Sequence, residues 1–256
     1  MATPFREMID ARSKNVSSKI VLALDLNVED EKNPLTKSLD IVKDAAPHLC
    51  AVKINRQLVL PMGLFGGVEK IVKAARDLGL PTIMDCKIND VGHTNVSIAS
   101  NYFKAGFDAV IASPFIGWKD GLEPVFAIAR KQGKGIILLV YMSHGGAVEG
   151  YGQRVYDEAS GIMKYQYEAF AEKALNWSAD GAVVGATYPD KIETIHSILG
   201  ERIPIYSPGI GAQGGDVEKA IRAGSRYLIV GRSIFGSENP ERSAKEIKDA
   251  ANRFQS

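Results

Sequence analysis

The chain has 256 residues, of which 45% are hydrophobic and 24% are charged, as expected for a globular protein with a sizeable core. Its 31 Lys and Arg residues nearly balance its 30 Asp and Glu residues, so neither nucleic acid nor an anionic membrane is expected as the main partner. The absence of long apolar segments and the lack of disulfide or metal spacing at Cys50 and Cys86 predict a cytoplasmic protein with two core cysteines.

Short apolar runs recur along the chain and predict strands. Each run is almost continuously apolar, which is typical of parallel strands that are buried on both faces. The predicted strands cover residues 20–26, 51–55, 82–84 leading into Asp85, 108–113, 136–142, 181–185, 203–207 and 226–230.

Segments with helical spacing of apolar residues alternate with these strands. They cover residues 33–46, 67–78, 95–105, 122–132, 163–178, 190–199, 216–223 and 241–254. Strict alternation of strands and helices implies a parallel sheet. Dividing 256 residues by eight gives 32 per unit, a length that favours a closed barrel over an open sheet. We therefore predict an α/β fold, a single (β/α)8 TIM barrel domain spanning residues 1–256.

The connection after the fifth strand, residues 143–153, is rich in glycine and lacks a helical pattern. Such a segment at the mouth of a barrel is typical of a mobile lid, and an ordinary surface loop is the alternative.

Charged residues gather where the third strand ends. Asp85 and Lys87 should face the same side, about 7 Å apart along an extended strand, and Asp90 and Thr94 follow. Buried charges must be compensated by each other or by a ligand. This pattern fits either a structural ion pair or a catalytic site.

Other strand ends also carry polar residues. Asp25 ends the first strand and Lys53 lies on the second, while Ser143 follows the fifth. Active sites of TIM barrels assemble at the carboxyl ends of the strands. Polar groups from so many strands at one face therefore predict a site at the barrel mouth.

Two segments after the seventh and eighth strands predict a phosphate site. Residues 207–216 hold four glycines before a helix, and Gly231 and Arg232 follow the eighth strand. Glycine allows backbone amides to approach an anion closely, and these two loops are the usual phosphate site of barrel enzymes. The four histidines (His48, His93, His144 and His196) lack metal-ligand spacing, and we expect surface or satisfied polar roles for them.

At these positions the chain resembles the orotidine 5′-phosphate decarboxylase family. Residues 85–90 match its Asp-x-Lys-x-x-Asp signature, which sugar-phosphate relatives also carry. The sequence Pro-Gly-Ile-Gly-Ala-Gln-Gly-Gly at residues 208–215 is more particular to the nucleotide decarboxylases. The likeness extends over nearly the whole barrel. It implies decarboxylation of orotidine 5′-phosphate to UMP without a cofactor or metal.

The resemblance also implies roles for the charged residues. Lys87 would donate the proton to C6 of the pyrimidine, and Asp85 would lie beside the substrate carboxylate. Asp25 and Lys53 would hold ribose hydroxyls. In the family, residues at the positions of Asp90 and Thr94 reach the neighbouring subunit's site, which implies a homodimer with a shared site.

Further binding residues follow from the same resemblance. Ser143 would contact the pyrimidine edge, and Gln213, Arg232 and the Gly231 amide would hold the phosphate. The loop after the seventh strand would complete the substrate site with Pro208, Gly209, Ile210 and Gly211.

The chain departs from the family between Asp90 and Thr94. Many members have Ile-Pro-Glu there, whereas this chain has Val91, Gly92 and His93. We expect Gly92 to loosen the segment, and the role of the His93 position is open.

Two other functions are compatible with parts of the pattern. The alternative within the same suprafamily is a Mg-dependent sugar-phosphate decarboxylase or aldolase, which would need another carboxylate near Asp85. A non-catalytic nucleotide-binding barrel is the third possibility, but binding alone needs no such charge cluster as that of Asp85 and Lys87.

Overall fold

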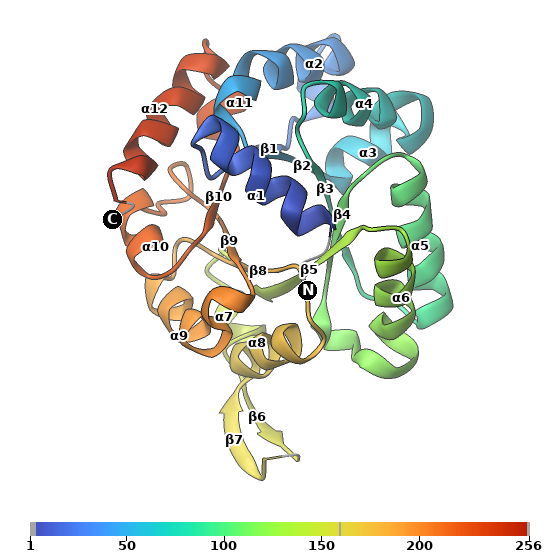
Figure 1. Ribbon diagram of the computed structural model, residues 1–256, viewed down its shortest axis with the longest axis vertical. Coiled ribbons are helices and arrows are strands. Elements are labelled where there is room, and N and C mark those ends of the chain that lie inside the picture. The colour runs from blue at the N-terminus through green and yellow to red at the C-terminus, as the bar shows by residue number, and fades with distance from the viewer. Residues whose placement is uncertain (1–3, 159, 255–256) are drawn as a thin grey trace.

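The computed structural model describes residues 4–158 and 160–254, and its centre is a closed barrel of parallel strands (Figure 1). The spatial order of the strands is β1-β10-β9-β8-β5-β4-β3-β2. Their bounds are β1 Ile20–Leu24, β2 Ala51–Asn55, β3 Thr82–Ile88, β4 Ala109–Ala112, β5 Gly135–Tyr141, β8 Gly181–Val184, β9 Ile205–Pro208 and β10 Tyr227–Val230. The predicted (β/α)8 architecture is confirmed.

Helices surround the barrel on its outside, as Figure 1 shows. The longer ones are α2 Pro34–Ala45, α4 Glu69–Asp77, α5 Gly92–Lys104, α6 Glu123–Lys131, α8 Gln166–Asn176, α9 Pro189–Leu199 and α12 Pro240–Asn252. Shorter ones are α3 Arg56–Met62, α7 Ala147–Gly150, α10 Val217–Arg222 and α11 Arg232–Phe235. Within the described ranges, no helix has the length and apolar character needed to cross a bilayer.

The alternation of side chains along each strand produces two apolar layers. One side of each strand packs against the helices, as Leu22 and Leu24 of β1 do. The other side fills the barrel interior, where Val21 and Ala23 of the same strand lie. The uninterrupted burial of the strands explains why each one reads as an apolar run. Cys50 and Cys86 are both buried in these layers, as predicted.

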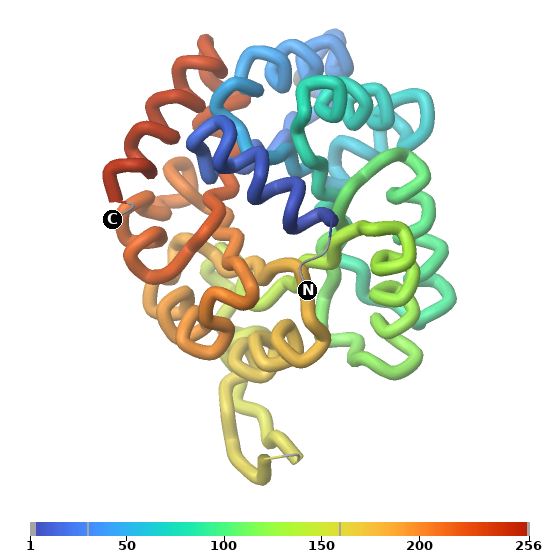
Figure 2. The backbone as a smooth tube through the Cα atoms, in the orientation of Figure 1, coloured from blue at the N-terminus to red at the C-terminus, as the bar shows by residue number. Residues whose placement is uncertain are grey.

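A helix that the sequence pattern did not predict closes the end of the barrel opposite the mouth. Helix α1 (Pro4–Val16) lies across the barrel in Figures 1 and 2. Its apolar residues Phe5 and Ile9 are fully buried in the interior layer. Gly135 at the start of β5 leaves room for the Phe5 ring, because a Cβ there would lie 2.3 Å from a ring carbon. The helix carries few apolar residues, so its sequence shows only a weak pattern.

A hairpin, β6 (Arg154–Asp157) and β7 (Ile162–Tyr165), projects from the side of the barrel (Figure 1). The prediction that residues 163–178 are helical is wrong for its first residues, because helix α8 begins at Gln166. Lys164 of β7 forms ion pairs with Asp157 at 2.7 Å and with Glu172 of α8 at 2.6 Å. These ion pairs join the two strands of the hairpin to each other and to the barrel wall.

The connection after β5 contains more regular structure than predicted. It includes α7 and the hairpin, and its first residues are anchored to the end of β8. Thr187 Oγ1 donates to the carbonyl of Ser143 at 2.9 Å, and the Tyr188 hydroxyl donates to the carbonyl of His144 at 2.9 Å. Whether this connection moves as a lid stays a prediction.

Candidate functional site

A cavity of about 450 Å³ opens at the carboxyl ends of the barrel strands. This volume lies within the range of small-molecule sites. Predicted site residues from six strands or the segments after them line its wall: Asp25, Lys53, Asp85, Lys87, Ser143, Pro208, Gly209, Ile210, Gln213, Gly231 and Arg232. The barrel therefore brings together residues that are up to 207 positions apart, from Asp25 to Arg232 (232 minus 25).

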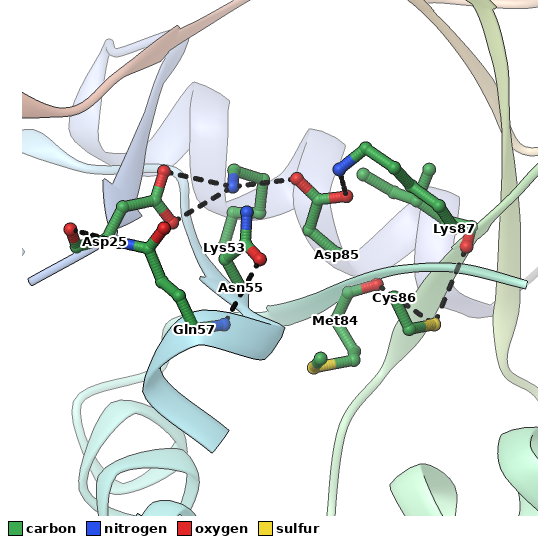
Figure 3. Close-up of polar contacts among 9 residues, drawn as sticks. Asp25, Lys53, Asn55, Gln57, Met84, Asp85, Cys86 and Lys87 are labelled. Atoms are coloured by element: carbon green, nitrogen blue, oxygen red, sulfur yellow. Dashed lines mark hydrogen bonds and ion pairs between the residues drawn. The ribbon is translucent and has the colours of Figure 1, made fainter. Parts of the chain in front are cut away.

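Four charged side chains form an alternating row along one side of the cavity (Figure 3). Lys53 Nζ lies 3.3 Å from Asp25 Oδ1 and 3.0 Å from Asp85 Oδ2. The other oxygen of Asp85 lies 2.6 Å from Lys87 Nζ. The row thus runs acid, base, acid, base across β1, β2 and β3, and its formal charges cancel.

Burial and ion pairing act against each other in this row. Burial raises the pKa of Asp85, but the ammonium groups of Lys53 and Lys87 outweigh burial and leave that pKa below its ordinary value. Burial likewise lowers the pKa of Lys53, whereas the carboxylates of Asp85 and Asp25 raise it above its ordinary value. Both groups therefore stay charged near neutral pH, although Lys53 is only 4% exposed.

The backbone of β3 is irregular where it carries the catalytic candidates. Lys87 has a φ of 48°, a conformation that is uncommon for a residue with a side chain. The pairing of β3 with β4 also shifts register between Met84 and Ile88. Bulges and strained residues are frequent next to active sites, where they redirect side chains. Cys86, between the two charged residues, has its pKa raised by burial to about 12 and stays a neutral thiol.

The glycine-rich loop after β9 lies across the barrel from β3, because β9 is four places from β3 in the ring of strands. Gly209 has a φ of 98°, and a Cβ there would lie 3.2 Å from Ser143 Cβ. The Ser143 hydroxyl donates to Gln213 Oε1 at 2.8 Å. Glycine at position 209 thus permits the loop after β9 to meet the loop after β5 at the cavity.

Three of the predicted site residues do not reach this cavity wall. Gly211 turns away, and its amide donates to the carbonyl of Gly215 at 2.9 Å within the loop. Asp90 and Thr94 lie beyond the end of β3, and Asp90 is exposed. Their position leaves them outside the site of their own chain.

The segment that carries Asp90 is well packed. Asn95 Oδ1 accepts a hydrogen bond from the Asp90 amide at 2.9 Å, and Asn95 Nδ2 donates to the Gly121 carbonyl at 3.1 Å. Gly92 is buried, and a Cβ there would lie 2.9 Å from the Asp120 carbonyl oxygen. The expectation that Gly92 loosens the segment is therefore wrong, because this glycine permits close packing. His93 is exposed at the start of α5.

Eleven of the 22 residues that line the cavity were not among the predicted site residues, and they include Asn55, Gln57, His144 and Phe235. Asn55 lies two residues after Lys53, so the two-residue period of a strand was a signal that could have found it. Gln57 Nε2 donates to the Asp25 carbonyl at 2.7 Å and supports the end of β1 (Figure 3). His144 follows Ser143 at the mouth of the cavity and is exposed, which is compatible with the surface role expected for it.

A model of one known protein family matches most of the chain. The model described as "Orotidine 5'-phosphate decarboxylase / HUMPS family" matches residues 18–247. The chain belongs to this family. The resemblance that the motif residues indicated is confirmed.

Curated relatives and a solved structure agree with this membership. An orotidine 5′-phosphate decarboxylase of Thermococcus kodakarensis is 38% identical over 231 residues, which are 90% of this chain and 95% of the relative. One from Methanosarcina mazei is 36% identical over 90% of this chain and 93% of its own length. The crystal structure of the enzyme from Pyrococcus horikoshii OT3 superposes with a TM-score of 0.73 at 34% identity, covering 91% of this chain and 99% of that one.

The family includes both nucleotide decarboxylases and the sugar-phosphate enzymes raised above as an alternative. The relatives named here are decarboxylases of the nucleotide, that is, carboxy-lyases of UMP synthesis, and they give the alternative no support. Among residues 4–158 and 160–254, no cluster of three or more His, Cys, Asp and Glu side chains is arranged to hold a metal ion.

Proposed function

We propose that this chain is an orotidine 5′-phosphate decarboxylase that forms UMP, the last step of de novo pyrimidine nucleotide synthesis, without a cofactor. The observation that carries the proposal is the alternating row Asp25, Lys53, Asp85 and Lys87, across the barrel from the glycine-rich loop after β9. One side of the cavity thus offers compensated charges for a reacting centre, and the other offers groups suited to a phosphate.

The phosphate end of the substrate would lie beside β9 and β10. Arg232 supplies a guanidinium and Gly231 a backbone amide, and the amide of Gln213 adds a neutral donor. The hydrogen bond from Ser143 to Gln213 Oε1 leaves Gln213 Nε2 to donate elsewhere. Ser143 would contact the pyrimidine edge, and Pro208, Gly209 and Ile210 line the wall between these groups.

The reaction needs stabilisation of negative charge at C6 of the pyrimidine. The bond between C6 and the carboxyl carbon breaks, CO₂ leaves, and the electron pair stays on C6. A preorganised ammonium group near that carbon stabilises the developing charge electrostatically. Lys87 then transfers a proton to C6 and regains one from solvent. The products are UMP and CO₂, and one proton is taken up from solvent.

Asp85 has two functions in this scheme. Its carboxylate holds Lys87 Nζ at 2.6 Å and Lys53 Nζ at 3.0 Å, which fixes both ammonium groups. It would also lie beside the substrate carboxylate, and loss of CO₂ removes that like-charge contact. Binding of the distant phosphate contributes to transition-state stabilisation by holding the pyrimidine against these charges.

We also propose a homodimer in which Asp90 and Thr94 complete the neighbouring site. Neither residue lines the cavity of its own chain. Exposed large apolar side chains occur in the connections after the adjacent strands β2, β3 and β4: Leu60, Phe65, Val91 and Phe115. Exposed apolar side chains in neighbouring loops are typical of a protein interface.

The decisive experiment is an absorbance assay for loss of orotidine 5′-phosphate in buffer without added metal. We expect turnover, with stoichiometric UMP and CO₂, that EDTA does not reduce. Activity that EDTA abolishes and Mg²⁺ restores would contradict a metal-independent decarboxylase. A protein that binds UMP but never consumes the substrate would contradict the enzymatic proposal.

A further inference from the structure

We propose that Asn95 is a positioning residue, whose buried side-chain amide fixes the backbone of Asp90 so that the Asp90 carboxylate reaches the site of the neighbouring subunit. This inference rests on the proposed function, because it takes the shared site of the homodimer as its starting point. Asn95 lies in the first turn of helix α5, five residues after Asp90, and it is fully buried.

The segment that follows β3 has to serve two different sites. Lys87 lines the cavity of its own chain, whereas Asp90, only three residues later, lies outside that cavity and is exposed. The direction in which the chain leaves β3 therefore determines where the Asp90 carboxylate lies relative to a partner subunit. An exposed loop residue that nothing holds would sample many positions, and ordering it on substrate binding would cost conformational entropy.

The side chain of Asn95 binds both polar groups of the Asp90 backbone. Asn95 Oδ1 accepts a hydrogen bond from the Asp90 amide at 2.9 Å, and Asn95 Nδ2 donates to the Asp90 carbonyl. An asparagine side chain can do both at once, because it offers an acceptor and two donors in one plane. The backbone of Asp90 is thus held from a buried position, although its side chain is exposed.

Asn95 also joins Asp90 to the connection after β4. Asn95 Nδ2 donates to the Gly121 carbonyl at 3.1 Å, in the segment Trp118–Leu122. Gly92 packs against the same segment, since a Cβ there would lie 2.9 Å from the Asp120 carbonyl oxygen. A buried polar network of this kind makes its surroundings rigid when its members are hydrogen-bonded. Asp90 is therefore fixed to the barrel wall and not to its own loop alone.

The same arrangement orients the Asp90 carboxylate. Asp90 Oδ1 accepts a hydrogen bond from the Val91 amide at 2.7 Å, which directs the side chain within the loop. The Asn95 backbone amide in turn donates to the Val91 carbonyl at 2.9 Å. Because Asp90 is exposed, its carboxylate stays accessible to a partner subunit.

A purely local role for Asn95, as a support of its own β3, makes the opposite prediction for mixed dimers. Each site of the proposed dimer takes Lys87 from one subunit and Asp90 from the other. If Asn95 acts through Asp90, Asn95→Ala damages the site of the neighbour. If Asn95 only supports β3, the substitution damages the site that contains Lys87 of the same chain.

The test mixes full-length Asn95→Ala protein with equal amounts of Lys87→Ala or Asp90→Ala protein and measures turnover of orotidine 5′-phosphate. Mass spectrometry verifies subunit exchange. Alone, Asn95→Ala should lose up to about 10²-fold in kcat/KM, as misplacement of a reacting group does. The mixture with Lys87→Ala should regain about a quarter of wild-type activity, because one hybrid site is intact. The mixture with Asp90→Ala should gain nothing beyond the activity of the Asn95→Ala subunits.

A second variant perturbs the same junction without changing Asn95. The new methyl group of Gly92→Ala would push against the Asp120 carbonyl. We expect Gly92→Ala to regain activity with Lys87→Ala and not with Asp90→Ala, and it carries the test if Asn95→Ala does not fold. Asn101→Ala, an exposed asparagine on the same helix, is the matched control and should keep wild-type turnover. Circular dichroism verifies that each variant is folded.

Other outcomes overturn the proposal. Recovery with Asp90→Ala, or no recovery with Lys87→Ala, would mean that Asn95 does not act through Asp90. Wild-type turnover of Asn95→Ala would remove it from the mechanism. If Lys87→Ala and Asp90→Ala recover with each other but Asn95→Ala does not recover with Lys87→Ala, this inference alone fails. If Lys87→Ala and Asp90→Ala do not recover with each other, the shared site of the proposed function fails with it.

Discussion

Lys87 Nζ lies 2.6 Å from Asp85 Oδ1, although the two residues are separated by one position on β3. The strand is not regular there, because Lys87 has a φ of 48° and the register with β4 shifts beside it. A strained backbone of this kind costs about 1–3 kcal/mol and persists only where its surroundings enforce it. The ion pair and the second contact of Asp85 with Lys53 supply such surroundings.

Substitution of Lys87 tests the proposed proton donor. Lys87→Ala should lower kcat by at least about 10²- to 10⁴-fold, the usual contribution of a positioned acid. Binding of a 6-substituted UMP analogue should persist, because the residues proposed to bind its phosphate lie across the barrel from Lys87. Steady-state kinetics and calorimetry measure the two effects. Lys104→Ala, on the exposed surface of α5, is the control, and near-normal turnover of Lys87→Ala would remove Lys87 from the mechanism.

Mixed subunits test whether Asp90 acts across a dimer. Lys87→Ala and Asp90→Ala proteins should each be inactive, and their mixture should regain activity, because one hybrid site carries neither defect. At equal amounts, half of the dimers are mixed and one of their two sites is intact, which predicts about a quarter of wild-type activity. Subunit exchange is verified by mass spectrometry. No recovery after complete exchange would contradict a shared site.

Arg232 is expected to act through the phosphate of the substrate. Loss of a hydrogen bond to a charged group corresponds to about 1.5–3 kcal/mol, so Arg232→Ala should raise KM roughly 10- to 150-fold. Uridine lacks the phosphate, so the inhibition constant of uridine as a competitive inhibitor should be the same for Arg232→Ala and for the wild type. Arg222→Ala, an exposed arginine paired with Glu218 on α10, is the matched control. If Arg232→Ala weakened the binding of uridine as much as that of the substrate, Arg232 would not bind the phosphate.

The buried face of α1 should stabilise the barrel without affecting catalysis. Phe5 is fully buried, and Phe5→Ala should lower the free energy of unfolding by about 3–5 kcal/mol. Met8 is 43% exposed on the same helix, so Met8→Ala should change the free energy of unfolding by about 0.5 kcal/mol or less. Urea unfolding gives both values. Because α1 closes the end opposite the mouth, kcat/KM per folded molecule should stay unchanged, and a loss would mean that α1 influences the site.

The ion pairs of Asp85 should make stability depend on pH in acid. The folded-state pKa of Asp85 is lowered by Lys53 and Lys87 against the opposing effect of burial. Such a group stabilises the fold above its unfolded pKa and loses that contribution as pH falls through the folded pKa. The difference in unfolding free energy between wild type and Asp85→Asn should be constant from about pH 5 to 8 and shrink below about pH 4. A difference that is constant down to pH 2 would contradict the ion-pair assignment.

The sequence by itself determined the barrel and 11 of the 22 residues that line the cavity. Buried parallel strands are apolar on both faces, so strands such as residues 20–24 and 135–141 can be predicted from their own sequence, without knowledge of the strands beside them. Residues at the ends of parallel strands meet at one edge, which placed Asp25, Asp85 and Arg232 together from their positions alone.

Tertiary structure decided what depends on partners distant in the chain. Helix α1 has few apolar residues, and only the open end of the barrel explains why Phe5 and Ile9 are buried. The hairpin that ends at Tyr165 is held by ion pairs to α8, whereas its sequence continues a helical pattern. No sequence pattern distinguishes Asn55 from other polar residues. Its place between Asp25 and Asp85 comes from strand register, which local sequence does not encode.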